Sequence, residues 1–335
     1  MQLCDQKSSV LIEFTIAKNS EILITNMNIN LIITHCYYII QKGKSMDTIS
    51  INKFGGDWTV DKLSILSSYL GFYLKALKNQ PFGKIYIDAF AGCGKIDTRN
   101  GTEEIIGSIR LALQTTGEFD KYIFIEKNPN YAIELQHIVD TDFPDLKDKV
   151  KIYNADCNDK LIEICDTTVN AELWKANRAV LFLDPYATEV KWATLEAIAN
   201  TKAIDMWYLF PFSAAQRMLP NLGVVDTWKN KLNGLFGDSS WETRFYIPDP
   251  QINMFGDTMM IKDVNTKELA AYICERLRSI FPYVADNPRF LYNKKNSPLF
   301  LFCFAVSNEN PKAIGLAKKV AEEHILKKGV SDEKD

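Results

Sequence analysis

Acidic side chains stand at the ends of four short apolar segments, where carboxylates are well placed to bind a polar ligand. The four are Asp88, Glu126, Asp156 and Asp184. The first begins the run Asp-Ala-Phe-Ala-Gly-Cys-Gly at 88–94, and glycines after a strand let the backbone turn tightly and approach a ligand closely. The Glu126 carboxylate can accept both ribose hydroxyls of an adenosine, and Asp156 can accept the exocyclic amine of the adenine. The set predicts an adenosine-binding site.

Two other interpretations of these residues stay open. Any one of the acids could simply cap the helix after its strand, but four in the same register favour a site. The glycine-rich run is not G-x-G-x-x-G, and Glu126 lies farther from Asp88 than the roughly 20 residues of a dinucleotide motif. A nicotinamide-dependent dehydrogenase is therefore the weaker alternative. Lys95 follows Gly94 without the Ser or Thr that completes a phosphate-binding P-loop.

The segments that carry the acids alternate with helical patterns. Runs that are apolar on both faces predict strands at 84–90, 121–126, 150–153, 178–184 and 204–210. Apolar residues at helical spacing predict a helix from Asp57 to the stop at 79–81, and further helices at 105–113, 131–139, 158–165 and 192–200. This alternation predicts an α/β fold with a doubly wound, mostly parallel, Rossmann-like sheet, in which ligands bind at the carboxyl ends of the strands.

The alternation breaks after Phe210. Residues 213–263 mix short helical pieces with loop signals such as Ile247-Pro248-Asp249-Pro250, and they predict a helical insertion. A helix is expected at 267–281, an antiparallel hairpin from 290–293 and 299–307, and a closing helix at 312–327. The pattern predicts one domain at 46–328, followed by a polar tail at 329–335.

Residues 1–45 do not fit this pattern. The uncharged run 22–41 has nearly the length of a membrane helix, but three asparagines, a threonine and His35 lie inside it, which argues against a membrane anchor. Lys42-Gly43-Lys44-Ser45 precedes Met46, and codons for Lys-Gly-Lys can spell a purine-rich ribosome-binding site. We therefore expect Met46 to be the native start and 1–45 to be a non-native or disordered leader.

The composition is that of a globular protein. Of the 335 residues, 47% are hydrophobic and 24% are charged, which excludes disorder along most of the chain. The net charge of −3 argues against a protein held to nucleic acid by bulk charge, although a local basic patch remains possible. The seven cysteines include no C-x-x-C pair, and there are only three histidines, so neither a disulfide framework nor a metal site is expected. A cytoplasmic protein is expected.

The motifs together resemble a known family. The run 88–94 is similar to the first motif, D-x-F-A-G-x-G, of class I S-adenosylmethionine-dependent methyltransferases, and FGGDWTVDKL at 54–63, LFLDPYATEVKW at 181–192 and IDMWYLFPF at 204–212 resemble the three-Cys-motif partner proteins of bacteria and phages. The resemblance implies a class I methyltransferase-like fold and S-adenosylmethionine as cofactor. It implies cofactor binding by Asp88, Phe90, Ala91, Gly92, Gly94, Glu126 and Asp156.

The resemblance also implies where a methyl group would be transferred. For the amine of an adenine or cytosine, Asp184 and the Pro185 carbonyl can hold the NH₂ while Tyr186 stacks on the base. Similar amino-methyltransferases have Asp-Pro-Pro-Tyr or Asn-Pro-Pro-Tyr, and the missing second proline changes the stacking geometry here. Cytosine C5 transfer is disfavoured because the Pro-Cys pair that it needs is absent after this strand.

Two functions follow as hypotheses. The first is an enzyme that methylates an amino group of nucleic acid. In it the insertion supplies a basic face with Arg217, Lys229, Lys231 and Arg244, interleaved with Trp228, Phe236 and Trp241. Trp192 and Trp207 can add to a stacking surface, although core packing suits Trp207 better. The alternative is a non-catalytic, cofactor-binding partner module that serves a neighbouring three-Cys-motif protein. We expect Lys62 to be a solvated helix residue and Pro211-Phe212 to anchor a buried loop.

Overall fold

The computed structural model describes residues 57–93, 95–96, 105–252 and 258–326. The expected leader at 1–45, the start at Met46, Gly94 of the glycine-rich run and the tail at 329–335 therefore lie outside the described residues. No helix of the described ranges has both the length and the apolar character that crossing a membrane requires.

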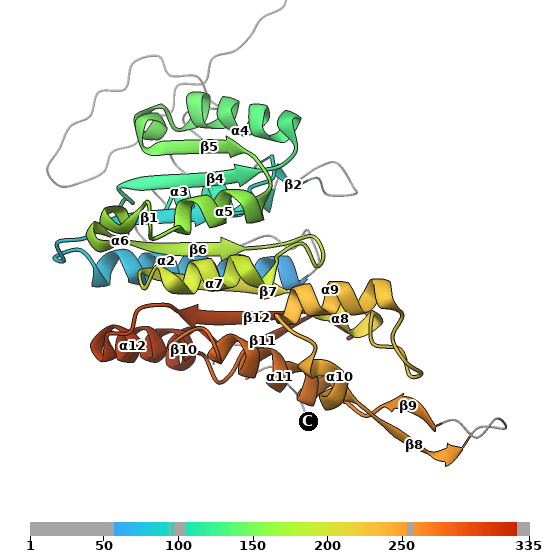
Figure 1. Ribbon diagram of the computed structural model, residues 1–335. Helices are drawn as coiled ribbons and strands as arrows, with labels where there is room; N and C mark the ends of the chain where they lie inside the picture. Colours follow the sequence, from blue (N-terminus) through green and yellow to red (C-terminus); the bar gives the residue numbers. More distant parts are fainter. Residues whose placement is uncertain (1–56, 94, 97–104, 253–257, 327–335) are drawn as a thin grey trace, which may run out of the picture. The chain divides into compact units, whose positions relative to one another are not determined.

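The fold is organised around a mixed sheet in which five strands are parallel. These strands are β1 (Gly83–Asp88), β4 (Lys121–Glu126), β5 (Val150–Asn154), β6 (Asn177–Leu183) and β7 (Ile204–Phe210). They lie in the order β5-β4-β1-β6-β7, so the chain reverses its direction of winding beside β1. The arrowheads of β4, β5 and β6 point the same way in Figure 1. Such a reversal is where open α/β sheets bind ligands.

Antiparallel strands complete the sheet beyond β7. The long strand β12 (Pro298–Val306) pairs antiparallel with β7, and its other side pairs with β10 (Tyr283–Val284) and β11 (Arg289–Tyr292). The hairpin expected near the C-terminus is thus confirmed as β11 and β12. A mostly parallel sheet with antiparallel strands at this end confirms the doubly wound, Rossmann-like α/β fold that the sequence predicts.

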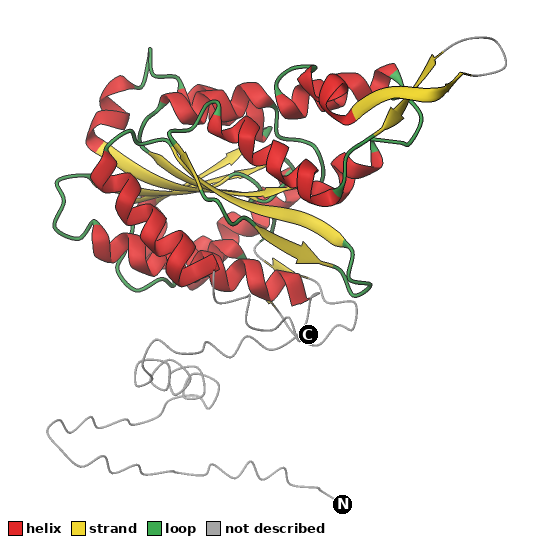
Figure 2. Cartoon of the chain, turned by 90° about the horizontal axis from the view of Figure 1, so that it is seen from below, coloured by secondary structure: helices red, strands yellow, loops and turns green. Residues whose placement is uncertain are grey.

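Helices cover both faces of the sheet (Figure 2). One core cluster joins the sheet to α5 (Cys157–Cys165), α6 (Ala171–Ala176), α7 (Trp192–Asn200) and α11 (Thr266–Arg278). The other joins it to α2 (Asp57–Ala76), α3 (Ser108–Leu113), α4 (Pro129–Asp142), η1 (Pro144–Lys149), α12 (Pro311–Lys318) and η2 (Lys319–Leu326). Alternate residues of β1 serve the two clusters, since Ile85 and Ile87 face one and Tyr86 faces the other. Burial on both faces explains the continuous apolar runs.

One expected helix is shorter than the sequence indicates. Ile105–Ile106 forms a short strand, β3, which pairs with β2 (Lys95–Ile96), and α3 begins only at Ser108. The prediction of a helix from Ile105 was wrong because two adjacent β-branched residues favour a strand, and the extended Gly107 then starts the helix.

The insertion after β7 is not wholly helical. It contains α8 (Phe212–Arg217), α9 (Asp226–Phe236) and α10 (Ser240–Phe245), followed by an antiparallel hairpin of β8 (Tyr246–Ile252) and β9 (Thr258–Lys262). Pro248 pointed to a loop, but it lies in β8, opposite Met260. A two-stranded hairpin has open edges, where a proline without an N–H group removes no ladder hydrogen bond.

Candidate functional site

The expected acids follow neighbouring parallel strands and meet at one edge of the sheet. Asp88 is opposite Phe124 of β4 and Phe182 of β6, and Glu126 is opposite Asn154 of β5. The carboxyl ends of β1, β4, β5 and β6 therefore lie side by side. Each carboxylate in this row has a different environment, and that environment decides what it can do.

Asp88 is fully buried and holds the loop that follows it. Its carboxylate accepts hydrogen bonds from the Ser108 hydroxyl at 2.5 Å, the Phe90 amide at 3.2 Å and the Tyr86 hydroxyl at 3.4 Å. Burial raises the pKa of Asp88 to about 6, although the hydrogen bonds from Ser108 and Phe90 oppose that shift. Asp88 is thus a positioning group for the glycine-rich loop. The sequence alone does not identify Ser108 as a partner of Asp88, because a lone serine at the start of a helix predicts only a helix cap.

The loop from Phe90 to Gly92 crosses from β1 toward β4. The Ala91 amide donates to the Ile125 carbonyl at 3.0 Å, and the Gly92 amide donates to Oε2 of Glu126 at 2.8 Å. Gly92 has a φ of +63°, in the left-handed region that glycine adopts without a steric penalty. The backbone therefore makes the tight turn that the sequence predicts, and this turn brings the loop against the Glu126 carboxylate.

Glu126 is half-buried at the end of β4. Its Oε1 accepts the Asn128 amide at 2.6 Å, while Oε2 accepts the Gly92 amide. A carboxylate has about four lone-pair sites, so two backbone donors leave acceptor capacity on both oxygens. The geometry suits an acid that orders a loop and also accepts a pair of vicinal hydroxyls.

Asp156 caps α5, as the alternative interpretation of an acid after a strand foresees. Its Oδ1 accepts the backbone and side-chain nitrogens of Asn158 at 3.0 and 3.1 Å, and its Oδ2 pairs with the exposed Lys127 ammonium at 3.0 Å. Although burial opposes the change, the hydrogen bonds from Lys127 and Asn158 lower the pKa of Asp156 below its ordinary value. Asp156 is therefore an ionised acceptor beside the end of β5.

Asp184 forms an ion pair with Lys62 of α2, a residue that lies in the N-terminal part of the domain. The Lys62 side chain is buried, with 8% of its surface exposed, and its ammonium lies 4.9 Å from the centre of the Trp58 ring. The expectation of a solvated Lys62 was wrong. Helical spacing carried the signal, because Lys62 stands four residues before the buried Leu66.

Tyr186 is much more exposed than the other expected catalytic residues. Pro185 is buried, but 93% of Tyr186 is exposed to solvent on the loop after β6. The stacking role of Tyr186 stays a prediction. Pro211 and Phe212 are both buried, and the Phe212 ring packs edge-on against Phe290 at 5.1 Å, so they anchor the loop after β7 as expected.

The aromatic residues that were expected to form a stacking surface are mostly in the core. Trp207 and Trp241 are fully buried, Phe236 is 1% exposed and Trp192 is 8% exposed. The Trp241 indole donates to Oδ1 of Asn233 at 2.7 Å, which fixes it inside the insertion. Trp192, Phe236 and Trp241 belong to the core cluster on one face of the sheet, so a stacking role for these three was wrong. Trp207 belongs to the cluster on the other face, which confirms the expectation of core packing. Trp228 is half-buried.

The basic residues of the insertion divide into two groups. Lys229 pairs with Glu242 at 2.8 Å. Arg217, Lys231 and Arg244 are exposed. The exposed cations stay the candidates for contact with nucleic acid.

The described cysteines are reduced. Four of them, Cys157, Cys165, Cys274 and Cys303, are buried, and Cys93 of the glycine-rich loop is half-buried. Burial of this kind is typical of cysteine as a small apolar core residue.

The solved structures described below share 10–14% sequence identity with this chain. No protein-family model matches the chain, and no curated protein matches it. Among solved structures, the chain is similar to LPL1258 from Legionella pneumophila, with 14% identity and a TM-score of 0.40 over 81% of this chain and 93% of that one. It is also similar to the methyltransferase domain of bacterial CtHen1, with 10% identity and a TM-score of 0.32 over 72% and 99% of the two chains. A third is the magnesium protoporphyrin IX methyltransferase ChlM from Synechocystis, solved with bound S-adenosylmethionine, with 12% identity and a TM-score of 0.29 over 71% and 98%.

Proposed function

We propose that this protein is an S-adenosylmethionine-dependent methyltransferase that acts on an amino group of nucleic acid. The observation that carries the proposal is the hydrogen bond between the Gly92 amide and the Glu126 carboxylate. It places a glycine turn and an acid with spare acceptor capacity at adjacent strand ends, beside the reversal of the sheet. A nucleoside with vicinal hydroxyls fits this combination.

Different residues at the carboxyl edge of the sheet bind different parts of the cofactor and the substrate in this proposal. The backbone of Phe90, Ala91 and Gly92 lies against the amino-acid part of the cofactor, Glu126 holds the ribose hydroxyls, and Asp156 accepts the adenine amine. Bound S-adenosylmethionine supplies an activated methyl group. Asp184 and the Pro185 carbonyl accept hydrogen bonds from the substrate amine and orient its nitrogen. Lys62 holds Asp184 in place through the ion pair.

Calorimetric titration with S-adenosylmethionine tests the cofactor assignment. We expect saturable binding to the wild-type chain and its loss in Glu126→Ala. Glu172→Ala, which removes an exposed acid paired only with Lys175, serves as the matched control and retains binding. Absence of binding by the wild type would refute the methyltransferase, and binding that survives Glu126→Ala would refute the ribose assignment alone.

Transfer of a labelled methyl group to total DNA, total RNA and protein then tests the substrate. Label in nucleic acid that is lost in Asp184→Asn supports the proposal, whereas label confined to protein contradicts it. Replacing Arg217, Lys231 and Arg244 together with glutamine should weaken nucleic-acid binding and flatten its dependence on salt, because each lost phosphate contact reduces the slope by about 0.9.

A non-catalytic partner module is the second candidate, and the surface of the insertion favours it. Five large apolar side chains there are 41–58% exposed: Leu222, Val225, Ile247, Met259 and Met260. Leu222 bridges to Ile261 of β9, and the Gly223 amide donates to the Met260 carbonyl, so these residues belong to one region. Exposed apolar groups of this kind are typical of protein-binding surfaces. The partner proposed here is a three-Cys-motif protein from a neighbouring gene.

The two candidates give different results in one experiment. A module binds S-adenosylmethionine without transferring its methyl group, and it binds the three-Cys protein through the insertion. Replacing Met259 and Met260 with serine would then abolish that complex and leave cofactor binding unchanged. An enzyme that turns over without the partner rules out the module.

A further inference from the structure

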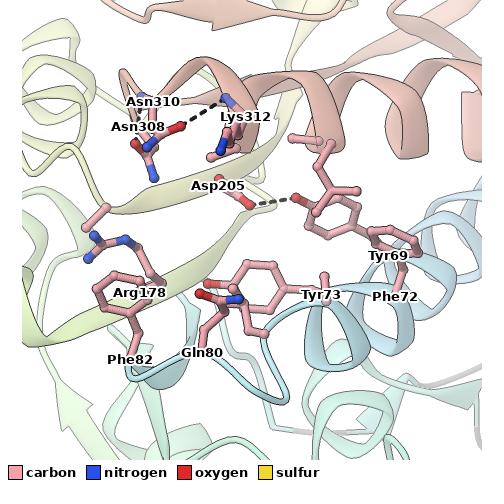
Figure 3. Close-up of a pocket in the computed structure, with 16 residues that line it drawn as sticks. Tyr69, Phe72, Tyr73, Gln80, Phe82, Arg178, Asp205, Asn308, Asn310 and Lys312 are labelled. Carbon is pink, nitrogen blue, oxygen red and sulfur yellow. Dashed lines mark hydrogen bonds between the residues drawn. The ribbon is translucent and has the colours of Figure 1, made fainter.

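A cavity lies at the edge of the sheet opposite the proposed cofactor site. It has a volume of about 390 Å³ and is lined by α2, the starts of β6 and β7, and the segment that leads into α12 (Figure 3). Arg178 and Asp205 are the second residues of β6 and β7, so both lie at the amino ends of these strands. A volume of this order suits a small organic ligand, since such pockets span roughly 300–1,000 Å³.

Asp205 provides a half-buried acceptor in this cavity. Its Oδ2 accepts the Tyr69 hydroxyl at 2.7 Å, and no described residue donates a hydrogen bond to Oδ1. Burial raises the pKa of Asp205 to about 6, against the opposing effects of Tyr69 and Arg178. The carboxylate has room for further donors, and a ligand with N–H groups would satisfy it.

Arg178 provides donors beside that acceptor. Val180 is paired with Asp205 in the sheet, so Arg178, two residues earlier, lies on the same face as Asp205. The guanidinium lies 3.8 Å from the centre of the Phe82 ring, and its Nη1 donates to the carbonyls of Trp174 and Asn177. These contacts fix the group, while the described residues contain no ion pair between Arg178 and Asp205. The donor and the acceptor therefore face one cavity without neutralising each other directly.

Tyr73 adds an unsatisfied polar atom to the same cavity. The residue is 6% exposed, and its buried hydroxyl has no hydrogen-bond partner among the residues that the structure describes. In Figure 3 the Tyr73 hydroxyl points into the space between Gln80, Arg178 and Asp205. A buried hydroxyl without a partner is costly, so a ligand that bonds to it removes that cost.

We propose that this cavity binds a guanine-type nucleobase, as a free nucleoside or nucleotide. One edge of guanine carries two adjacent N–H donors, which suit the Asp205 carboxylate, and a carbonyl oxygen, which suits a donor such as Arg178. The rings of Phe72, Tyr73 and Phe82 line the walls and can contact the faces of the planar base. Other ligands fit this pair less well. Adenine would place a ring-nitrogen acceptor against the Asp205 carboxylate, which is itself an acceptor. A phosphate alone would be repelled by the Asp205 carboxylate, and a simple amine would be repelled by the Arg178 guanidinium. The proposal does not depend on methyl transfer.

Equilibrium dialysis of the full chain carrying Glu126→Ala, which removes the ribose acceptor of the proposed adenosine site, tests the proposal with guanosine, adenosine and cytidine. We expect saturable binding of guanosine and affinity at least about tenfold lower for the other two, because a hydrogen bond to a charged group changes affinity by about that factor. Failure of guanosine to saturate at millimolar concentration, or equal binding of adenosine, overturns the proposal.

Two variants locate the binding. The ionised Asp205 side chain offers acceptors only, whereas asparagine offers one donor and one acceptor. Asp205→Asn should therefore weaken the binding of guanosine about tenfold. It should strengthen the binding of xanthosine, in which a second carbonyl replaces the amine of guanine. Tyr73→Phe should weaken guanosine without disturbing the fold, since its hydroxyl bonds to no described residue. Asp140→Asn, at an exposed acid of α4, is the matched control and should change neither nucleoside. An Asp205→Asn variant with unchanged base preference overturns the assignment.

The experiment also separates this site from the cofactor site. Glu126→Ala should leave guanosine binding intact, and Asp205→Asn should leave S-adenosylmethionine binding intact, because the two sets lie at opposite ends of the strands. Guanosine binding that disappears in Glu126→Ala would place the nucleoside at the other edge and overturn the proposal, whatever the fate of the methyltransferase assignment.

Discussion

Lys62 and Asp184 form an ion pair across 122 positions of the chain. Lys62 belongs to α2 and Asp184 follows β6, so the pair joins the first described helix to the edge of the sheet where the acids meet. Both partners affect the pKa of Asp88, since Asp184 raises it and Lys62 lowers it. The charges of Lys62, Asp88 and Asp184 therefore influence one another, and α2 supplies the cation among them.

Lys62→Met removes the cation of this pair and leaves Asp184 without its partner. We expect a loss of about 1–3 kcal/mol in the free energy of unfolding, because a partly buried carboxylate loses a charged hydrogen bond. Lys175→Met breaks an exposed pair with Glu172 and should cost less than about 0.5 kcal/mol. Urea denaturation measures both. Equal losses in the two variants would mean that the Lys62 pair is an ordinary surface contact.

Gly92→Ala tests the turn of the glycine-rich loop. A Cβ at Gly92 meets no atom within 4 Å, so any cost comes from the φ of +63° and should be about 1 kcal/mol. Gly234 in α9 also has open space but no positive φ, and alanine there should stabilise the helix by about 0.5–1 kcal/mol. Thermal unfolding of the two variants should shift in opposite directions, and a shift of the same sign would contradict the strained turn.

Tyr69→Phe and Tyr73→Phe differ by one hydrogen bond. Tyr69 donates to the half-buried carboxylate of Asp205, so its variant should lose about 1–3 kcal/mol of stability. The Tyr73 hydroxyl has no hydrogen-bond partner within the described part of the chain, so its variant should be neutral or slightly more stable. Guanidinium denaturation distinguishes them. Loss of stability in Tyr73→Phe would show that its hydroxyl is satisfied in solution.

Asp88 makes stability depend on pH. Its pKa is about 6 in the fold and 3.8 when unperturbed, so between these values the native state holds a proton that the unfolded state lacks. The Asp88 contribution to stability is therefore complete below about pH 4 and is lost as the pH rises through about 6. Relative to Asp88→Asn, the wild type should gain about 2 kcal/mol between pH 7 and about pH 4. Comparing the two chains cancels the other titrating groups, and parallel pH profiles would refute the raised pKa.

Most of the fold follows from local pattern. Runs such as 121–126 and 204–210 are apolar on both faces, and the strands occupy those same residues. The helix at 192–200 is likewise as expected. The secondary-structure predictions were wrong where two local preferences compete. Ile105 continues an apolar helical pattern, but it is β-branched and lies in a strand. Pro248 is typical of a loop, yet it lies in a strand with an open edge.

The sequence by itself determined which residues meet at the carboxyl edge, because parallel strands in one sheet must end on the same side. It also predicted a tight glycine turn after the first strand, which the positive φ of Gly92 confirms. Only the tertiary structure decided that Lys62 is buried against Asp184 and that Asp205, Arg178 and Tyr73 share a cavity. Those contacts join residues far apart in the chain, and the packing of α2 on the sheet sets them. No local preference encodes that packing angle, so periodicity predicts a buried face without identifying the residues across from it.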